Sequence, residues 1–349
     1  MKKHIILSGI LFSTLFLTQC ATANNKKNMN NNSVYGESAV LAKEIPTKLL
    51  FDKIIPGSVV VRNNYDAKKS KNIIYKEGKD YIIDYKNGTI TRTKKSRIPD
   101  YSKHSLYKVK NFDYTKVKSY SNQPFLIWID YKSENNTDIS KPIVYQKNIK
   151  KTLDKLESGK PVKIIVFGDS ISCGGEVTEP RFAFYERFKK SLQKKYPQSK
   201  ITLENGATGG DTTVQGLERL KNKVLTRKPD LVLVGFGMND HNINFVAPDR
   251  FQKNLKSIVK KIKSKTGADV LLLSTFQPNN DWNANAHNMK TYAGITKAVA
   301  KETKSAYADV YSVWKKVLKR KDQPSLLNNN INHPTNFGHW MYSQAFIIE

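Results

Sequence analysis

The stretch VKIIVFGDSISCGG at 162–175 constrains the fold more than any other part of this 349-residue chain. Its first half, 162–167, is short, largely apolar and rich in β-branched residues, which is typical of a buried parallel strand. The run stops at Gly168, Asp169 and Ser170, which are small or polar. A parallel strand delivers the residues that follow it to the carboxyl edge of its sheet, where open α/β folds place their chemistry. Ser170 is therefore a candidate nucleophile.

The length allows two domains, or one large domain with an extension. The chain carries 59 Lys and Arg against 30 Asp and Glu, a formal net charge of +29 spread along its length. Such a balance suggests an anionic partner, such as an acidic glycan, a membrane surface or nucleic acid, and the alternative is a solvated lysine-rich surface. No zinc-finger spacing or aromatic RNA-binding motif accompanies the charge, so we expect no nucleic-acid partner.

The first 20 residues predict export from a bacterial cell. Two lysines precede an apolar stretch at 5–17 that is too short to span a bilayer as a stable helix. The sequence LTQC at 17–20 resembles a bacterial lipoprotein cleavage box with Cys20 as the lipidated residue, although Gln19 stands where a small residue is usual. Cleavage after ATA at 21–23 is the alternative. We favour a signal peptide at 1–20 and a periplasmic or cell-surface lipoprotein anchored in the membrane through Cys20.

Residues 21–45 begin with an Asn-rich segment without apolar periodicity, which predicts a flexible tether. A β pattern follows at 46–150, where strand-like runs at 81–85 and 89–93 flank Lys86-Asn87-Gly88. Asn-Gly between two such runs is a strong hairpin signal. Further strand-like runs occupy 58–62 and 125–130. We interpret 46–150 as a small β-rich, sandwich-like accessory domain.

From about 151 to 349 the pattern changes to alternating strands and helices. Apolar strand candidates and amphipathic helix candidates follow one another along the chain. This alternation predicts a parallel sheet covered by helices on both faces. The expected strands are 162–167, 200–205, 231–236 and 269–275, and the expected helices are 181–195, 213–227, 249–264, 288–303 and 335–346.

Four short polar blocks stand at the ends of these elements. They are Gly-Asp-Ser at 168–170, Asn-Gly-Ala-Thr-Gly-Gly-Asp-Thr-Thr at 205–213, Gly-Met-Asn-Asp at 237–240 and Asn-His-Pro-Thr-Asn-Phe-Gly-His at 332–339. Each block alone is weak evidence, because Gly-Asp-Ser is more often a turn than a nucleophile. Their order and their places at strand ends together are much more specific.

In this order and context the blocks resemble those of the SGNH (GDSL) hydrolase family, over about 162–346. The resemblance implies a flavodoxin-like, three-layer α/β/α domain and a serine esterase without metal or cofactor. It implies Ser170 as nucleophile and His333 as the base that takes its proton. It also implies an oxyanion hole made by the backbone N–H groups of Ser170 and Gly210 and the side-chain amide of Asn239.

One position departs from the family pattern. The family usually has an aspartate three residues before the histidine, and here that residue is Asn330. An amide can accept the ring N–H but cannot neutralise an imidazolium. Three outcomes remain open: a Ser170–His333 dyad assisted by Asn330 or a backbone carbonyl, an acid supplied from elsewhere, or a weakened enzyme. We favour the first.

An exported enzyme with a β-rich accessory domain suggests a polymeric substrate. Family members with a similar Asn-His-Pro block and an N-terminal β-domain resemble carbohydrate esterases, so we expect removal of O-acetyl groups from a glycan through an acetyl-Ser170 intermediate. The basic surface favours an acidic polysaccharide. The alternatives are a lipase or thioesterase of the same family, and a catalytically weakened glycan-binding protein.

Overall fold

The computed structural model describes residues 32–135, 137–242 and 246–349. The predicted signal peptide, the lipidation of Cys20 and the tether at 21–31 lie outside the described residues and stay predictions. Within the described residues, no helix is both long enough and apolar enough to cross a membrane.

A parallel sheet forms the centre of the α/β part, and in the described chain it has five strands in the order β12-β11-β10-β8-β9. Read from β9, this order is the 2-1-3-4-5 arrangement of flavodoxin-like folds, as predicted. The strands are β8 (Val162–Gly168), β9 (Ile201–Asn205), β10 (Leu231–Gly235), β11 (Asp269–Leu273) and β12 (Ala306–Ala308). The short edge strand β12 was not predicted, because Ala-Tyr-Ala carries no strand signal.

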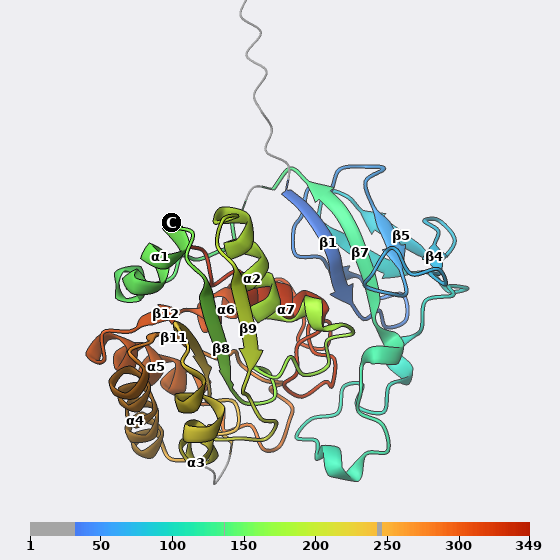
Figure 1. The fold of residues 1–349 in the computed structure, drawn as a ribbon. Helices are drawn as coiled ribbons and strands as arrows, with labels where there is room; N and C mark the ends of the chain where they lie inside the picture. The colour runs from blue at the N-terminus through green and yellow to red at the C-terminus, as the bar shows by residue number, and fades with distance from the viewer. Residues whose placement is uncertain (1–31, 136, 243–245) are drawn as a thin grey trace, which may run out of the picture. The chain divides into compact units, whose positions relative to one another are not determined.

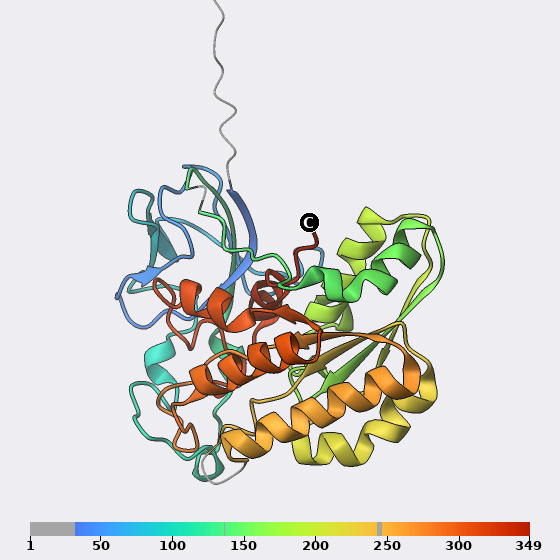
Figure 2. The same cartoon turned by 90° about the vertical axis from the view of Figure 1, so that its left-hand side faces the viewer.

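Helices cover both faces of this sheet (Figures 1 and 2). One layer contains α3, which packs on α4, and α4, which packs on α5. The other contains α7, which packs on both α2 and α6. All five predicted helices are present, and α1 and α6 were missed. The bounds are α1 (Lys150–Glu157), α2 (Phe184–Lys195), α3 (Thr213–Lys223), α4 (Pro248–Thr266), α5 (Met289–Glu302), α6 (Val310–Val317) and α7 (Asn336–Ser343).

Two antiparallel sheets make up the N-terminal part, with strand orders β1-β7-β3-β4 and β2-β6-β5 in the described residues. The predicted hairpin is confirmed as β5 paired with β6. Its Gly88 has φ +61°, and a Cβ there would lie 2.1 Å from the Phe51 carbonyl oxygen, so the turn requires glycine. The strands are β1 (Asn32–Ala39), β2 (Thr47–Lys48), β3 (Val60–Arg62), β4 (Ile74–Tyr75), β5 (Tyr81–Asp84), β6 (Thr89–Arg92) and β7 (Ile127–Ser133).

The structure corrects the described part of the flexible tether predicted at 21–45: Val40 and Leu41 are buried, and 32–39 form strand β1. This strand pairs antiparallel with β7, with a register shift between Val34 and Glu37. The segment lacks a run of apolar residues, and polar Glu37 and Ser38 are buried in it. Tertiary partners distant in the sequence therefore make this strand, and local composition could not reveal them.

Short 3₁₀ turns connect several of these elements. They are η1 (Tyr101–Lys103), η2 (Tyr114–Lys116), η3 (Gln123–Phe125), η4 (Gln146–Ile149), η5 (Pro180–Phe182) and η6 (Leu225–Arg227).

The position of β8 decides where the polar blocks meet. It lies between β9 and β10, so the chain leaves β8 toward one side of the sheet and later returns to the other side. This is a topological switch point, the place where open α/β sheets bind their ligands. The blocks after β8, β9 and β10 consequently meet at one edge.

Candidate active site

The turn after β8 presents Ser170 because glycines allow two backbones to meet closely. Gly168 is paired with Gly235 of β10, and a Cβ on Gly168 would lie 2.1 Å from the Gly235 carbonyl oxygen. The backbone N–H of Asp169 donates to that same oxygen at 3.3 Å. Asp169 is buried beneath the turn, while Ser170 is only partly buried. The nucleophile candidate therefore stands on a tightly fixed turn with its hydroxyl accessible.

The loop before α7 presents His333, and the side chain of Asn329 shapes this loop. The amide oxygen of Asn329 accepts the backbone N–H groups of Ile331, Asn332 and His333, each at 2.9 Å. The backbone N–H of Asn328 donates to the His333 carbonyl at 2.8 Å. These bonds close a compact loop and fix the backbone from which the imidazole projects.

The structure brings Ser170, His333 and Glu176 into one hydrogen-bonded chain. His333 Nε2 lies 2.8 Å from Ser170 Oγ, and His333 Nδ1 lies 3.1 Å from Glu176 Oε1. A carboxylate only accepts, so Nδ1 carries the proton and donates to Glu176. In the neutral ring Nε2 is then the acceptor for the Ser170 hydroxyl. This is the arrangement of a nucleophile, a base and an orienting acid.

Glu176 belongs to the same loop as Ser170, and glycines bring that loop against the histidine. A Cβ on Gly175 would lie 2.8 Å from the Ser170 carbonyl oxygen and 3.5 Å from His333 Cε1. Glu176 itself has φ +62°, and its carbonyl oxygen accepts from the Asn328 side chain at 3.2 Å. The acid is thus tied to the loop that carries His333.

Sequence reasoning missed Glu176 as a partner of His333. Its side-chain direction depends on the left-handed backbone at Glu176, which no residue pattern indicates. The one available signal was a carboxylate that closely follows the nucleophile after two glycines. Of the three outcomes left open above, the structure therefore favours the second, in which a residue other than Asn330 supplies the acid.

Asn330 does not occupy the orienting position that we expected. It is buried with φ +57°, and its amide oxygen accepts from the side chains of Asn122 and Asn279, both at 3.2 Å. Among the described residues, none of its hydrogen bonds reaches His333. The left-handed backbone turns the Asn330 side chain toward Asn122, in the N-terminal part, so the expected assistance to the imidazole has no geometric basis.

The proposed oxyanion donors Gly210 and Asn239 lie in the loops that follow β9 and β10. A Cβ on Gly209 would lie 3.9 Å from Ser170 Cβ, whereas a Cβ on Gly210, whose φ is +79°, would meet no heavy atom within 4 Å among the described residues. The Asn239 side chain donates to the Asp211 carbonyl at 2.9 Å, which fixes its amide beside this loop. An amide has two N–H donors, so this bond leaves Asn239 a second one.

Two buried carboxyl groups lie below the site. Burial raises the pKa of Asp169 to about 7, and the neighbouring Asp240 contributes to the rise. Burial also raises the pKa of Asp240 to about 6, against the hydrogen bonds that it accepts from Thr213. The Thr213 N–H and hydroxyl donate to Asp240 at 2.9 and 2.6 Å, and so join the second block to the third.

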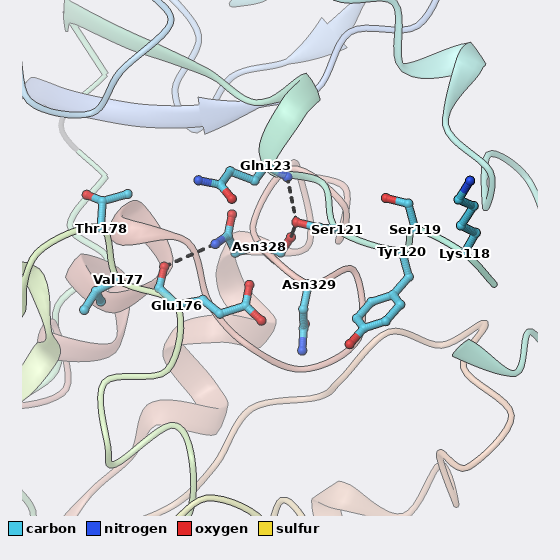
Figure 3. A pocket seen from close by; sticks show the side chains of 10 residues that line it. All are labelled: Lys118, Ser119, Tyr120, Ser121, Gln123, Glu176, Val177, Thr178, Asn328 and Asn329. Carbon is cyan, nitrogen blue, oxygen red and sulfur yellow. Dashed lines mark hydrogen bonds between the residues drawn. The ribbon is translucent and has the colours of Figure 1, made fainter. Parts of the chain in front are cut away.

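A polar cavity of about 520 Å³ has Glu176 in its lining (Figure 3). One wall is the loop 118–123 of the N-terminal part, and the other walls come from 176–178 and from Asn328 and Asn329. Among the described residues, no cluster of three or more His, Cys, Asp or Glu side chains is arranged to hold a metal ion.

Residues 166–341, about half of the chain, match the model of the GDSL-like lipase/acylhydrolase family. The chain belongs to this family. As a GDSL-like acylhydrolase it is a serine hydrolase that acts on esters.

Among the relatives of this GDSL-like hydrolase is an acetylxylan esterase from Geobacillus stearothermophilus, 27% identical over 56% of this chain and 95% of that protein. The solved structure of Axe2, an acetylxylan esterase from the same organism, is 26% identical over 53% of this chain and 91% of that one, with a TM-score of 0.46. A two-domain esterase active on acetylated mannans is 22% identical, with a TM-score of 0.48 over 59% of this chain. The match spans only 56% of that two-domain chain.

Proposed function

We propose that this hydrolase removes O-acetyl groups from a glycan. The observation that carries the proposal is the hydrogen-bonded chain Ser170–His333–Glu176 at the edge of a polar cavity. Similarity to an acetylxylan esterase over 95% of that protein's length supports the substrate class. Sugar hydroxyls suit a cavity lined by amides and hydroxyls, whereas a long acyl chain needs an apolar channel.

The first half of the reaction forms an acetyl-enzyme. Ser170 Oγ attacks the acetyl carbonyl while His333 Nε2 takes its proton, and the Glu176 carboxylate stabilises the imidazolium through Nδ1–H. The backbone N–H groups of Ser170 and Gly210 and the Asn239 amide donate to the oxyanion, each worth roughly 10²–10³ in turnover. The tetrahedral intermediate then expels the sugar oxygen, which takes the proton from Nε2. The alcohol leaves and acetyl-Ser170 remains.

The second half releases acetate. A water molecule on the exposed side of the ester gives its proton to His333 Nε2 and attacks the acetyl carbonyl. The same donors stabilise the second oxyanion, and Ser170 Oγ leaves with the proton returned from Nε2. The same three side chains thus serve both halves.

Acetate release from acetylated xylan tests the proposal. We expect the wild-type protein to release acetate and the Ser170→Ala variant to release none above the uncatalysed rate. If the folded wild-type protein releases no acetate from acetylated xylan, mannan or an acidic acetylated polysaccharide, the proposal fails.

A lipase or thioesterase would use the same three residues with a larger acyl pocket. Nitrophenyl esters of increasing acyl length separate the two functions. An acetylesterase prefers acetate and loses activity as the acyl chain grows, whereas a lipase shows the opposite trend. A glycan-binding protein without turnover was suggested by Asn330 alone, and the presence of Glu176 beside His333 removes that reason.

We also propose, from the sequence of the first 20 residues, that the enzyme acts outside the cytoplasm as a lipoprotein anchored through Cys20. Globomycin-sensitive processing of the full-length chain and its loss in Cys20→Ala would support the anchor. Processing that persists in Cys20→Ala would favour cleavage after residue 23.

A further inference from the structure

The cavity at Glu176 continues into a second one. The second cavity reaches into the N-terminal part and shares four lining residues with the first: Gln123, Glu176, Thr178 and Asn328. The two therefore form one depression, which we call the polar groove. The volume of its larger half, about 520 Å³, falls within the roughly 300–1,000 Å³ of known ligand sites.

Uncharged hydrogen-bonding side chains dominate the polar groove. Six amides line it: Asn63, Asn64, Gln123, Asn328, Asn329 and Asn336. The hydroxyls of Ser119, Ser121 and Thr178 add donors and acceptors. Two lysines are balanced by two carboxylates, of which Asp66 is paired with Arg181 and Glu176 is bonded to His333. The groove is therefore polar without a strong charge of either sign, despite the basic surface of the whole protein.

The loop between β3 and β4 forms one end of the polar groove, and the hydrolase part holds it in place. Tyr65 accepts a hydrogen bond from Arg187 at 2.7 Å and packs edge-on against Phe182 with ring centroids 4.7 Å apart. Asp66 forms an ion pair with Arg181. The loop is thus anchored from outside its own sheet.

The loop 118–123 forms a second wall and is anchored to the histidine loop. The backbone N–H of Asn122 donates to the Asn328 carbonyl at 2.7 Å, and its side chain donates to the Leu327 carbonyl at 2.8 Å. Asn330 accepts from the same side chain. Both walls are consequently fixed relative to His333 before any ligand arrives, which lowers the entropic cost of binding.

We propose that the polar groove binds the sugar units next to the acetylated one, and that the N-terminal sheet domain supplies one side of this binding site. The inference rests on the proposed function, because it places the sugar chain beside the Ser170–His333–Glu176 site. The groove's amides and hydroxyls pair with sugar hydroxyls, and the partly buried Tyr120 offers a ring to a sugar face (Figure 3). The ligand class is an uncharged glycan of several units.

The test uses Tyr120→Ala and Gln123→Ala, singly and together, in the full-length protein. Both side chains line the groove; Gln123 is exposed, whereas Tyr120 also packs edge-on against Tyr114, so urea unfolding checks that each variant is folded. The control is Gln198→Ala, an exposed glutamine between α2 and β9, at the opposite edge of the sheet. Each variant is assayed for kcat/KM on acetylated xylotetraose and on 4-nitrophenyl acetate, which has no sugar chain.

We expect the double variant to lose roughly tenfold more kcat/KM on the oligosaccharide than on the nitrophenyl ester, which corresponds to about 1.4 kcal/mol of lost sugar contacts. The control Gln198→Ala should keep the wild-type kcat/KM on both substrates. Equal losses on both substrates, or no loss on either, would overturn the proposal.

Binding separates this inference from the proposed function. Calorimetry of acetylated xylotetraose with Ser170→Ala should give an affinity that falls about tenfold when the two groove substitutions are added. Binding without acetate release by the wild-type protein would keep the groove and reject the esterase. Acetate release with an affinity that the groove substitutions leave unchanged would reject the groove and keep the esterase. A preference for an acidic acetylated oligosaccharide over the neutral one would reject the uncharged ligand class.

Discussion

At the scale of single residues, Glu176 changes how the catalytic chain is assembled. Ser170 and Glu176 lie on one loop after β8, whereas His333 comes from the loop before α7, far away in the sequence. Because about a third of the Glu176 side chain (34%) is exposed, water weakens its electrostatic effect relative to a buried acid. We therefore expect Glu176 to act mainly by holding the imidazole in the productive tautomer.

Replacement of Glu176 by glutamine should lower kcat strongly. The amide can offer an N–H to His333 Nδ1 and so favour the wrong tautomer, which costs up to about 10⁴-fold in the serine-protease comparison. Partial exposure of Glu176 leads us to expect about 10²–10³-fold. The measurement is kcat on 4-nitrophenyl acetate, with the exposed Glu44→Gln as control. A loss below threefold in folded Glu176→Gln would mean that Glu176 does not orient His333.

Asn330→Asp tests the position where the family usually has its acid. The side chain is buried between Asn122 and Asn279 and is not bonded to His333, so an added carboxylate does not reach the imidazole. We expect no gain in kcat, and a loss of about 1–3 kcal/mol in unfolding free energy for burying a carboxyl group there. Urea unfolding measures the second effect. A several-fold gain in kcat would show that the family position still works.

At the scale of elements, strand–helix alternation predicted most of the α/β part, because its strands are continuous apolar runs and its helices are amphipathic. The four polar blocks predicted which loops meet, since parallel strands share one carboxyl edge. The loop conformations were beyond sequence reasoning. Left-handed residues such as Glu176 and Asn330 decide where each carboxylate or amide points, and their side chains carry no sign of it.

Helix α7 provides a pH-dependent contribution to stability through His339. The ring is fully buried, accepts the Phe184 N–H at Nδ1 and donates to the Gly175 carbonyl through Nε2, both at 3.4 Å. Burial is the main cause that lowers its pKa to about 3, and the positive charge of Arg187 adds to the effect. The unfolded chain therefore binds a proton between pH 6.5 and 3 that the native protein does not bind.

As the pH falls through that window, the contribution of neutral His339 to the unfolding free energy should decline by about 1.4 kcal/mol for each pH unit. We expect the unfolding free energy of the wild type, relative to His339→Gln, to decline with this slope from pH 6 to pH 4. Asp169 and Asp240, whose pKa values are raised, contribute with the opposite sign and cancel in the comparison. Parallel pH dependences for wild type and variant would contradict the assignment to His339.

At the scale of the whole molecule, the N-terminal sheets and the C-terminal segment share a buried contact. Glu37 of β1 and Lys321, both fully buried, form an ion pair of 2.7 Å. The Tyr131 hydroxyl donates to Glu37 at 2.6 Å, and Lys321 donates to the Ser38 carbonyl at 3.1 Å. No local pattern reveals a pair so distant in the sequence, which is why β1 was mistaken for tether. The boundary near residue 150 stays a prediction.

Removal of one partner should destabilise the whole described fold. Lys321→Met leaves a buried carboxylate without its counter-charge, and we expect a loss of about 3–5 kcal/mol in unfolding free energy. Adding Glu37→Gln should restore part of this loss. The control is Lys150→Met, which breaks an exposed pair with Asp154 and should change stability little. Unfolding of Lys321→Met at the wild-type urea midpoint would show that the pair is dispensable.

The acetyl-enzyme is the most direct test of the central claim. Wild-type protein is mixed with an excess of acetylated xylotetraose, quenched with acid within the first turnover and digested for mass spectrometry. We predict one acetyl group on Ser170, absent from Ser170→Ala and formed more slowly in Glu176→Gln. Acetate released without any acetylated Ser170, or an acetyl group on another residue that turns over at the catalytic rate, would contradict the account.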